Sequence, residues 1–260
     1  MTSLTAISGC PRAVTAEWSD GEAGLGRMDG WEDRAQSWIR WARTPNFDAY
    51  WLYRETFFSE VVPPPGRATL EVGCGEGRVA RDLVERGHSV TAVDPSPTLL
   101  QAARAVDPSS TYQLARAERL PFADAAFDLV VAYNSLMDVD EMPQAVAEAA
   151  RVLAPQGRLA VCVTHPVSDA GDFVGPEVEA PFQIAGSYLG RRRFTGHFER
   201  AGLAMDFDGW CFDLETYSRA LEACGLGIEL LREPPPSGDR QPRRRRIPNF
   251  LMFRARRLGV

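Results

Sequence analysis

From residue 69 to residue 80 the chain reads Thr69-Leu70-Glu71-Val72-Gly73-Cys74-Gly75-Glu76-Gly77-Arg78-Val79-Ala80. The stretch begins as a short, mostly apolar run, as in a strand, and ends as the first turn of a helix. Three glycines stand between them at alternate positions, with the carboxyl of Glu71 two residues before the first. Glycine is favoured where φ is positive or where a ligand must approach bare backbone. The stretch therefore predicts a strand, a tight turn and a helix whose N-terminus can hold a ligand.

Strand and helix patterns alternate on both sides of this turn. After the first strand, further strands are expected over Ser89 to Val93, Thr111 to Ala115, Ala126 to Ala132 and Arg158 to Thr164. Helices are expected over Arg78 to Arg86, after Pro97, and over Met142 to Leu153. A last helix, Leu214 to Cys224, precedes two final strands, Ile228 to Leu231 and Phe250 to Ala255. This alternation predicts an α/β fold with a parallel sheet covered by helices on both faces.

Three segments flank or interrupt this pattern. Residues 1–26 are rich in Gly, Ser, Thr and Ala and lack periodicity, which predicts a flexible N-terminus. Residues 27–65 are crowded with aromatic side chains that allow two amphipathic helices, packed on the sheet edge or forming a lid over a ligand. In the main domain, 66–260, the insertion 166–210 is also aromatic. It is expected to cover a substrate pocket, or else to be a structural hairpin or dimer interface, with strands around Ile184 to Tyr188, Phe194 to Glu199 and Leu203 to Phe207.

Composition narrows the possible partners. The chain has 260 residues, 45% of them hydrophobic and 25% charged, and a net charge of −6. No run approaches the roughly 18 apolar residues of a membrane span, and no secretory signal is visible, so a cytoplasmic protein without a membrane partner is expected. The five cysteines are scattered and form no C-x-x-C pair, which predicts reduced thiols and no metal site. The acidic balance argues against nucleic acid as the main partner.

The glycine stretch has the pattern E-x-G-x-G-x-G, which resembles the first motif of class I S-adenosylmethionine-dependent methyltransferases of the small-molecule type. The dinucleotide pattern G-x-G-x-x-G fails, because Arg78 stands where its third glycine would fall. A second signal is Asp94, which ends the second strand 17 residues after Gly77. A carboxylate there accepts hydrogen bonds from ribose hydroxyls in nucleotide-binding folds. The alternative is that Asp94 only caps the helix that follows Pro95.

Two further motifs extend the resemblance over roughly residues 70–163. The run from Ala115 to Phe122, followed by Phe127-Asp128, is similar to the family's segment beside the adenine ring. The resemblance places Ala117 and Glu118 there, although Arg116 replaces a common aspartate. It places Tyr133 and Asn134, at the end of the fourth strand, beside the methionine part of the cofactor, although Asp138 replaces a common histidine. Gly73, Gly75, Gly77 and Pro95 complete the implied cofactor site, with Glu71 and Asp94.

The resemblance implies a Rossmann-like, doubly wound, seven-stranded sheet with a final antiparallel strand, an N-terminal helical cap and an aromatic insertion after strand 5. It implies methyl transfer from S-adenosylmethionine to a small-molecule acceptor, as O- or N-methylation, with secondary metabolites as one candidate class. The alternative is an RNA- or other macromolecule-modifying enzyme that uses the arginine-rich loops, Arg191–Arg193 and Arg243–Arg246. A non-catalytic cofactor-binding protein is the third hypothesis. A monomer or homodimer is expected.

The acceptor site is the least defined part of this prediction. His165 ends the fifth strand at the same edge as the glycine turn, so we expect it at the acceptor, where a neutral imidazole could take a proton. His197 is its main rival, and Tyr188 and Trp210 are further candidates for contact with the substrate. The alternative is that His165 only hydrogen-bonds the loop that it begins, and that orientation alone carries the reaction.

Overall fold

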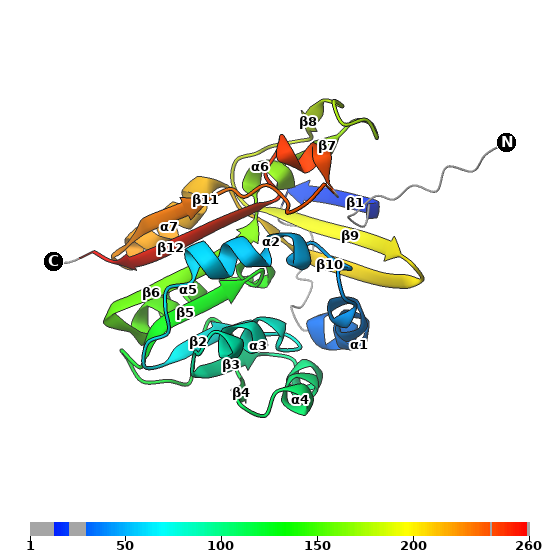
Figure 1. Ribbon diagram of the computed structural model, residues 1–260. Helices are drawn as coiled ribbons and strands as arrows, with labels where there is room; N and C mark the ends of the chain where they lie inside the picture. Colours follow the sequence, from blue (N-terminus) through cyan, green and yellow to red (C-terminus); the bar gives the residue numbers. More distant parts are fainter. Residues whose placement is uncertain (1–12, 21–29, 240, 259–260) are drawn as a thin grey trace.

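The computed structural model, which describes residues 13–20, 30–239 and 241–258, has a seven-stranded sheet at its centre (Figure 1). Its strands are β2 (Thr69–Val72), β3 (Val90–Asp94), β4 (Thr111–Leu114), β5 (Phe127–Tyr133), β6 (Leu153–Thr164), β11 (Leu226–Arg232) and β12 (Phe250–Arg257). Their order is β11-β12-β6-β5-β2-β3-β4, and only β12 runs antiparallel to its neighbours. This confirms the predicted Rossmann-like sheet. Its strand order reverses between β2 and β5, where ligands of such sheets bind.

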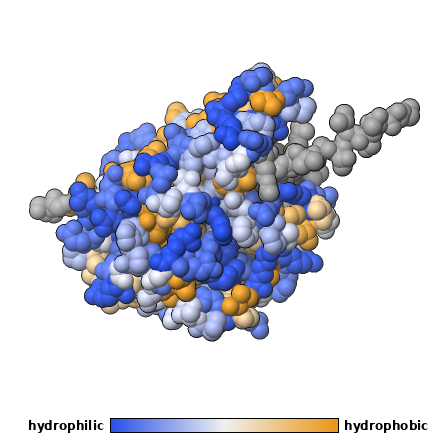
Figure 2. Space-filling view, viewed as in Figure 1, coloured by the Kyte–Doolittle hydropathy of each residue, from blue (hydrophilic) through white to orange (hydrophobic). Residues whose placement is uncertain are grey.

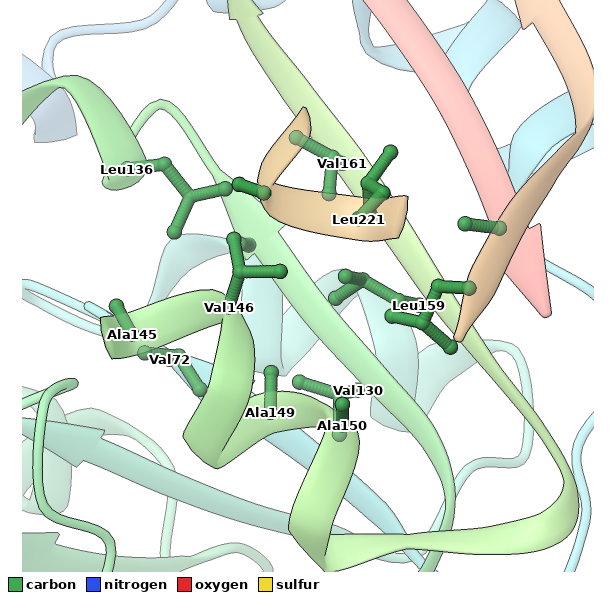
Figure 3. Close-up of a cluster of buried hydrophobic side chains, with 14 of the residues drawn as sticks. Val72, Val130, Leu136, Ala145, Val146, Ala149, Ala150, Leu159, Val161 and Leu221 are labelled. Atoms are coloured by element: carbon green, nitrogen blue, oxygen red, sulfur yellow. The ribbon is translucent and has the colours of Figure 1, made fainter. Parts of the chain in front are cut away.

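Helices cover both faces of the sheet because its central strands are apolar on both sides. On β5, Val130 and Ala132 belong to one core cluster, whereas Leu129, Val131 and Tyr133 belong to the other. The first cluster lies under α5 (Met142–Val152) and α7 (Leu214–Ala223). Figure 3 shows the small side chains of α5 facing Val130, Leu159 and Val161. The second cluster lies under α3 (Arg78–Glu85) and α4 (Pro97–Val106).

The N-terminal cap has two parts with different positions. Helix α2 (Tyr50–Thr56) continues into the π-helical turn η1 (Phe57–Val61), and both pack into the second core cluster. Helix α1 (Gly30–Arg43) lies instead against α4 and β10 (Leu203–Cys211). The Glu32 carboxylate fixes it there, accepting hydrogen bonds from Ser96 Oγ and from Thr98 Oγ1 at 2.5 Å. One helix of the segment thus covers the sheet while the other is free to cover a ligand.

A second, three-stranded sheet corrects the expectation for the N-terminus. Strand β9 (Arg192–Arg200) pairs with β10, and β1 (Ala13–Asp20) adds to its other edge. Residues 13–20 are therefore ordered as a strand, whereas 1–12 and 21–26 lie outside the described residues. The missed signal was the alternation of Val14, Ala16 and Trp18 with polar residues, which is typical of a strand. Its partner strand is far away in the sequence, so local composition alone suggested flexibility.

The insertion also differs in detail from expectation. A short helix, α6 (Pro166–Asp169), opens it, although no helix was expected there. Two short strands follow, β7 (Gly171–Phe173) and β8 (Phe182–Ile184), and they form a hairpin of their own. The strand expected around residues 184–188 thus lies earlier in the chain. Figure 1 shows α6, β7 and β8 beyond the β12 side of the main sheet, away from β4.

The face seen in Figure 2 is mostly hydrophilic, with hydrophobic residues in scattered spots rather than one continuous patch. Among the described residues, no helix has both the length and the apolar character needed to cross a membrane. Among the described residues, most buried apolar side chains belong to the two clusters beneath the helices, and a smaller third cluster lies between α1 and the β9–β10 hairpin.

Phe57 joins the cap to the sheet and provides a test of this packing. Its side chain is fully buried and its ring centre lies 4.8 Å from that of Tyr133 at the end of β5. We expect Phe57→Ala to lower the free energy of unfolding by about 3–5 kcal/mol, because it leaves a cavity between cap and sheet. Urea unfolding measures this. Leu189→Ala, at an exposed position, should stay within about 0.5 kcal/mol of wild type. Equal losses for the two variants would contradict the described docking.

Candidate active site

A cavity of about 880 Å³ opens at the carboxyl edge of the main sheet. Its floor is the turn after β2 together with the ends of β3 and β5. Aromatic residues of α1, β9 and β10 line it above this floor, and residues of α6, β7 and the short helix η3 (Pro242–Arg245) line the side toward β12. The cavity thus lies between the main sheet and every segment that the sequence set apart as cap or insertion.

The glycine turn has the conformation that its sequence predicts. Gly73 and Gly77 have φ values of +75° and +84°, where L-residues with a side chain are strained. A Cβ at Gly73 would also clash with Ser135, and one at Gly77 would lie 2.8 Å from the Tyr112 hydroxyl. Gly73 and Gly75 line the cavity, whereas Gly77 packs behind the turn and begins α3. The sequence thus brings bare backbone to the cavity floor at the start of a helix.

Asp94 ends β3 and holds this turn from the side. Its Oδ2 accepts a hydrogen bond of 2.8 Å from Gly75 N, and its Oδ1 accepts one of 2.9 Å from Ser96 N. Burial raises the pKa of Asp94 to about 6, against the opposite effect of these two hydrogen bonds. The Asp94 carboxyl and Pro95 line the cavity, where remaining lone pairs of the carboxylate can accept hydroxyl donors. This geometry is compatible with both predicted roles of Asp94, binding ribose hydroxyls and capping the following helix, since one carboxylate can do both.

Buried polar atoms at the end of β2 and β5 lack protein partners. Glu71 is 2% exposed, and its Oε2 has no hydrogen-bond partner among the described residues. Burial, reinforced by the charge of Asp94, raises the pKa of Glu71 well above its ordinary value. Asn134, with φ of +50°, and Tyr133 also line the cavity and also have an unpartnered side-chain oxygen. Unsatisfied buried polar groups are costly, so this donor and acceptor set fits a polar, cationic ligand group.

The residues expected beside the adenine ring line the cavity, and Arg116, which replaces a common aspartate, lies among them. Ala117 and Glu118 line the cavity, as does Arg116. Arg116 Nη2 lies 3.1 Å from Glu118 Oε1. The arginine that replaces a common aspartate therefore pairs with the carboxylate that remains.

An aromatic wall stands above the glycine turn. The ring centres of Trp31 and Trp38 on α1 lie 5.6 Å apart, and those of Trp38 and Phe207 on β10 lie 6.1 Å apart. Trp38 also contacts the turn, since a Cβ at Gly75 would lie 3.1 Å from its Nε1. Trp210 lines the cavity from the end of β10, as expected for a substrate residue. This wall can exclude water from whatever the floor holds.

Asp138 and Asp208 face the cavity beside this wall. Asp208 forms two hydrogen bonds with Arg193, of 2.6 and 2.5 Å, which fix its carboxylate. Asp138 accepts a hydrogen bond from Trp31, and burial together with Asp208 and Asp94 raises its pKa to about 8, in spite of Arg34. At neutral pH Asp138 is therefore largely protonated. The residue that replaces a common histidine keeps a titratable group near neutrality.

His165, expected at the acceptor, does not line the cavity. It caps α6: its Nδ1 accepts a hydrogen bond of 3.1 Å from Val167 N, so its Nε2 donates to Glu233 Oε1 at 2.7 Å. The ring is 2% exposed, and burial lowers its pKa. The structure therefore corrects the expectation in favour of its alternative, because Nδ1 is bonded to the segment that His165 begins and Nε2 is bonded to Glu233, outside the cavity. Being at the right edge of a sheet did not determine which way the side chain points.

Tyr188 and His197 also lie outside the cavity lining. The Tyr188 hydroxyl accepts a hydrogen bond from Leu214 N at 3.4 Å, at the start of α7. The two ring nitrogens of His197 contact Asp206 and Glu199 on the outer surface of the β9–β10 hairpin, at 2.6 and 3.2 Å. Strand alternation explains this: His197 points to the face opposite that of its neighbours Gly196 and Phe198.

Several cavity residues were not singled out from the sequence. Arg78 pairs with Asp48 at 2.6 Å, and its guanidinium lies 4.3 Å from the ring centre of Tyr50. All three line the cavity, as do Gln241, Arg243 and Arg244 of the segment before β12. The signal for Arg78 was its place directly after the third glycine. In the second group, Arg243 and Arg244 had been noted only as part of an arginine-rich loop. No sequence pattern placed this group at the cavity, because it reaches the cavity only through the antiparallel final strand.

The corrected role of His165 can be tested through stability. His165→Ala removes the cap of α6 and should lower the free energy of unfolding by about 1 kcal/mol at pH 7. His165→Asn, which keeps a capping side chain, should lose less. Because the folded-state pKa lies below the unfolded value, His165 destabilises the wild type as the pH falls below about 6.5. Urea unfolding between pH 7 and 5 should therefore show a shallower pH dependence for both variants; an unchanged profile would contradict the buried neutral ring.

Comparison with known proteins agrees with this geometry. A family model described as a methyltransferase domain matches residues 70–161. Over 183 residues the chain is 36% identical to a demethylmenaquinone methyltransferase of Tropheryma whipplei, covering 69% of this chain and 73% of that protein. It is also 40% identical over 99 residues to an uncharacterized methyltransferase of Mycobacterium tuberculosis, where the match spans 38% of this chain and only 40% of the relative.

A solved structure matches over more of the chain. The S-adenosylmethionine-dependent methyltransferase from Mesorhizobium loti superposes with a TM-score of 0.62 at 25% identity, covering 80% of this chain and 98% of that one. The similarity therefore extends well beyond the glycine motif, over the part of the chain that forms the glycine turn and the main sheet. The chain belongs to the class I S-adenosylmethionine-dependent methyltransferases, and S-adenosylmethionine is its methyl donor.

Proposed function

We propose that this enzyme transfers the methyl group to an oxygen or nitrogen of a small-molecule acceptor that is enclosed in the same cavity as the cofactor. One observation carries the proposal: a single cavity of about 880 Å³ joins the glycine turn to the aromatic wall and to the α6–β7 side. That volume lies near the upper end of the range typical of small-molecule sites, about 300–1,000 Å³. It therefore suits a nucleoside cofactor with a small acceptor beside it.

The floor residues would hold the cofactor. The Asp94 carboxylate would accept hydrogen bonds from the ribose hydroxyls, and Glu71 and Asn134 would accept them from the ammonium group. A cation beside Glu71 would offset the burial that raises its pKa. Ala117 and Glu118 would lie along the adenine ring, with Pro95 between ribose and base. When bound, the cofactor supplies a methyl group on a positively charged sulfur, already activated for displacement.

The protein then has mainly to orient the acceptor and exclude water. Trp38 and Phe207 close the wall above the glycine turn, which keeps the reacting groups in a fixed, dry space. Orientation of this kind can contribute about 7–11 kcal/mol to the lowering of a barrier. Asp138 lines the cavity and is largely protonated at neutral pH, because its pKa is about 8. It would therefore donate a hydrogen bond to the acceptor, and it would take up a proton only in its ionised form.

Two observations favour a small acceptor over RNA. The relative from Tropheryma whipplei is named for a small molecule, demethylmenaquinone. Arginines of both runs are engaged with protein groups: Arg191 lies 3.5 Å from the ring centre of Trp210, and Arg193 pairs with Asp208. Arg243 and Arg244 line the cavity itself. Nucleic acid would need such groups presented outward along a track of phosphates.

The cofactor site can be tested without knowing the acceptor. Asp94→Ala should weaken binding of S-adenosylhomocysteine by about fivefold to 150-fold, because it leaves ribose hydroxyls and Gly75 N unpaired in a buried site. Calorimetry measures the affinity, and circular dichroism checks that the variant is folded. Asp124→Ala, at an exposed surface ion pair, is the matched control and should bind as wild type does. Equal affinity in both variants would refute the assignment.

The acceptor class is tested with methyl-labelled S-adenosylmethionine. The enzyme is incubated separately with a small-molecule extract, total RNA and a protein extract, and the label is followed into each fraction. We expect transfer to a small organic product, lost in Asp94→Ala and kept in Asp124→Ala. Label found only in RNA or protein would contradict the small-molecule proposal while leaving the methyltransferase assignment intact.

A further inference from the structure

Four arginines gather at the side of the cavity toward β12. Arg243, Arg244 and Arg246 surround one ring, that of Phe173 on β7, with guanidinium carbons 5.4, 5.6 and 5.8 Å from its centre. Arg243, Arg244 and Phe173 all line the cavity. Arg192, at the start of β9, lies close enough to act on the same carboxyl, Asp169, as Arg244 does. In Figure 1 this region, around α6 and β7, lies away from β3, at whose end the glycine turn is held.

Most of this positive charge lacks a carboxylate partner. Arg244 Nη1 donates to Ser168 Oγ at 2.6 Å, Arg243 to the Gly175 carbonyl, and Arg246 to the carbonyls of Val178 and Ala180. Within the described part of the chain, no carboxylate lies within ion-pair distance, 4.0 Å, of any of the three. Guanidinium groups that meet in a concave, partly dry site attract anions more strongly than exposed ones do.

Arg192 adds a desolvated charge behind them. Its side chain is 4% exposed, and its Nη2 donates to the Asp169 carbonyl at 3.3 Å. Its Nε and Nη1 have no partner among the described residues. Asp169 and Asp172 are the acidic residues that line this side of the cavity, together with Arg243 and Arg244. Arg192 and Arg246 lie behind this lining, near Asp169 and Phe173, so four arginines surround two carboxyls. The local balance is therefore positive in a chain whose net charge is negative.

Gln241 supplies a second and independent observation. It is 7% exposed, it lines the cavity, and neither its Nε2 nor its Oε1 has a partner among the residues described. A buried amide without partners is costly unless a ligand satisfies it. An oxygen of an anionic ligand can accept from the amide Nε2 and from a guanidinium fork at the same time.

We infer that the acceptor is a small organic anion whose carboxylate is bound by Arg243, Arg244 and Gln241. This inference rests on the proposed function, because it names the charge of the acceptor that the cavity encloses. The anionic group anchors one end of the acceptor, and the methyl-accepting atom then lies toward Asp138 and the floor of the cavity. A cationic acceptor would meet fewer free carboxylates in the cavity. The Asp208 carboxylate is hydrogen-bonded to Arg193, and Asp138 is largely protonated at neutral pH.

The test is a charge series of three probes of nearly equal shape: 2-naphthoate, 2-naphthamide and 2-naphthylmethylamine. Calorimetry measures their binding to the enzyme saturated with S-adenosylhomocysteine. We expect the naphthoate to bind at least about tenfold more tightly than the amide, and the amine to bind most weakly, because an ionised acceptor roughly doubles the strength of a hydrogen bond. Equal binding of the three, or tighter binding of the amine, would overturn the inference.

Variants test whether Arg243 and Arg244 cause the preference for naphthoate. In Arg243→Gln/Arg244→Gln the preference for naphthoate should shrink to within about threefold, whereas affinity for S-adenosylhomocysteine stays as in wild type. The matched control is Arg245→Gln in the same short helix, since Arg245 pairs with Asp239 and does not line the cavity. An undiminished preference in the double variant would also overturn the inference, and the wild-type series decides alone if that variant does not fold. If the wild-type enzyme binds S-adenosylhomocysteine but none of the three probes, both this inference and the proposed small-molecule pocket are refuted.

Discussion

The hydrogen bond from Gly75 N to the Asp94 carboxylate is the interaction on which the rest of this structure depends. It links the glycine turn that follows β2 to the end of the neighbouring parallel strand β3, and so fixes the conformation of the turn. The same carboxylate holds Ser96 N, and Ser96 in turn caps α4 and donates to Glu32 on α1. A single buried acid thus connects the cavity floor, the helix behind it and the helix above it.

Much of the fold could be predicted from the sequence because its signals are local. Glycines that require positive φ, an aspartate at a strand end and the apolar run of β5 each determine structure within a few residues. Two helices were also predicted for residues 27–65, as packing on the sheet or as a lid over a ligand. Helix α2 packs into the core cluster, and α1 lines the cavity. Strand β1 was missed because its order depends on β9, a partner about 180 residues away.

The acceptor site could not be predicted in the same way, because side-chain direction is set by tertiary contacts. His165 stands at the expected edge, yet its ring turns toward Glu233, which lies 68 residues further along the chain. Strand alternation turns His197 to the face opposite Phe198, outside the cavity. Trp210 is on the same face of the hairpin as His197 but nearer the end of β10, where it lines the cavity. The arginines before β12 entered the prediction only as part of the alternative that involves RNA or another macromolecule. They reach the cavity because β12 returns antiparallel beside β6 and brings its preceding segment to the carboxyl edge.

Charge is distributed unevenly along the cavity, and this organises the proposed chemistry. Glu71 and Asp94 lie at the floor, where the cationic cofactor would bind under the proposed function, and Arg243 and Arg244 line the side toward β12. Such opposite ends would orient both reactants by charge before any specific contact forms. Between them stand Trp38 and Phe207, which offer no ion pair of their own. This division would place the two proposed ligands at opposite ends of one cavity.

The most direct test of the account is a crystal structure of the enzyme with S-adenosylhomocysteine. The account predicts the ribose against the Asp94 carboxylate and the amino-acid part beside Glu71 and Asn134. It also predicts that the space toward Phe173 and Arg244 stays free of cofactor and holds solvent or an added carboxylate. A cofactor that lies against Arg243 and Arg244, or one bound outside this cavity, would contradict the central claim that the glycine turn and the arginine side serve two separate ligands.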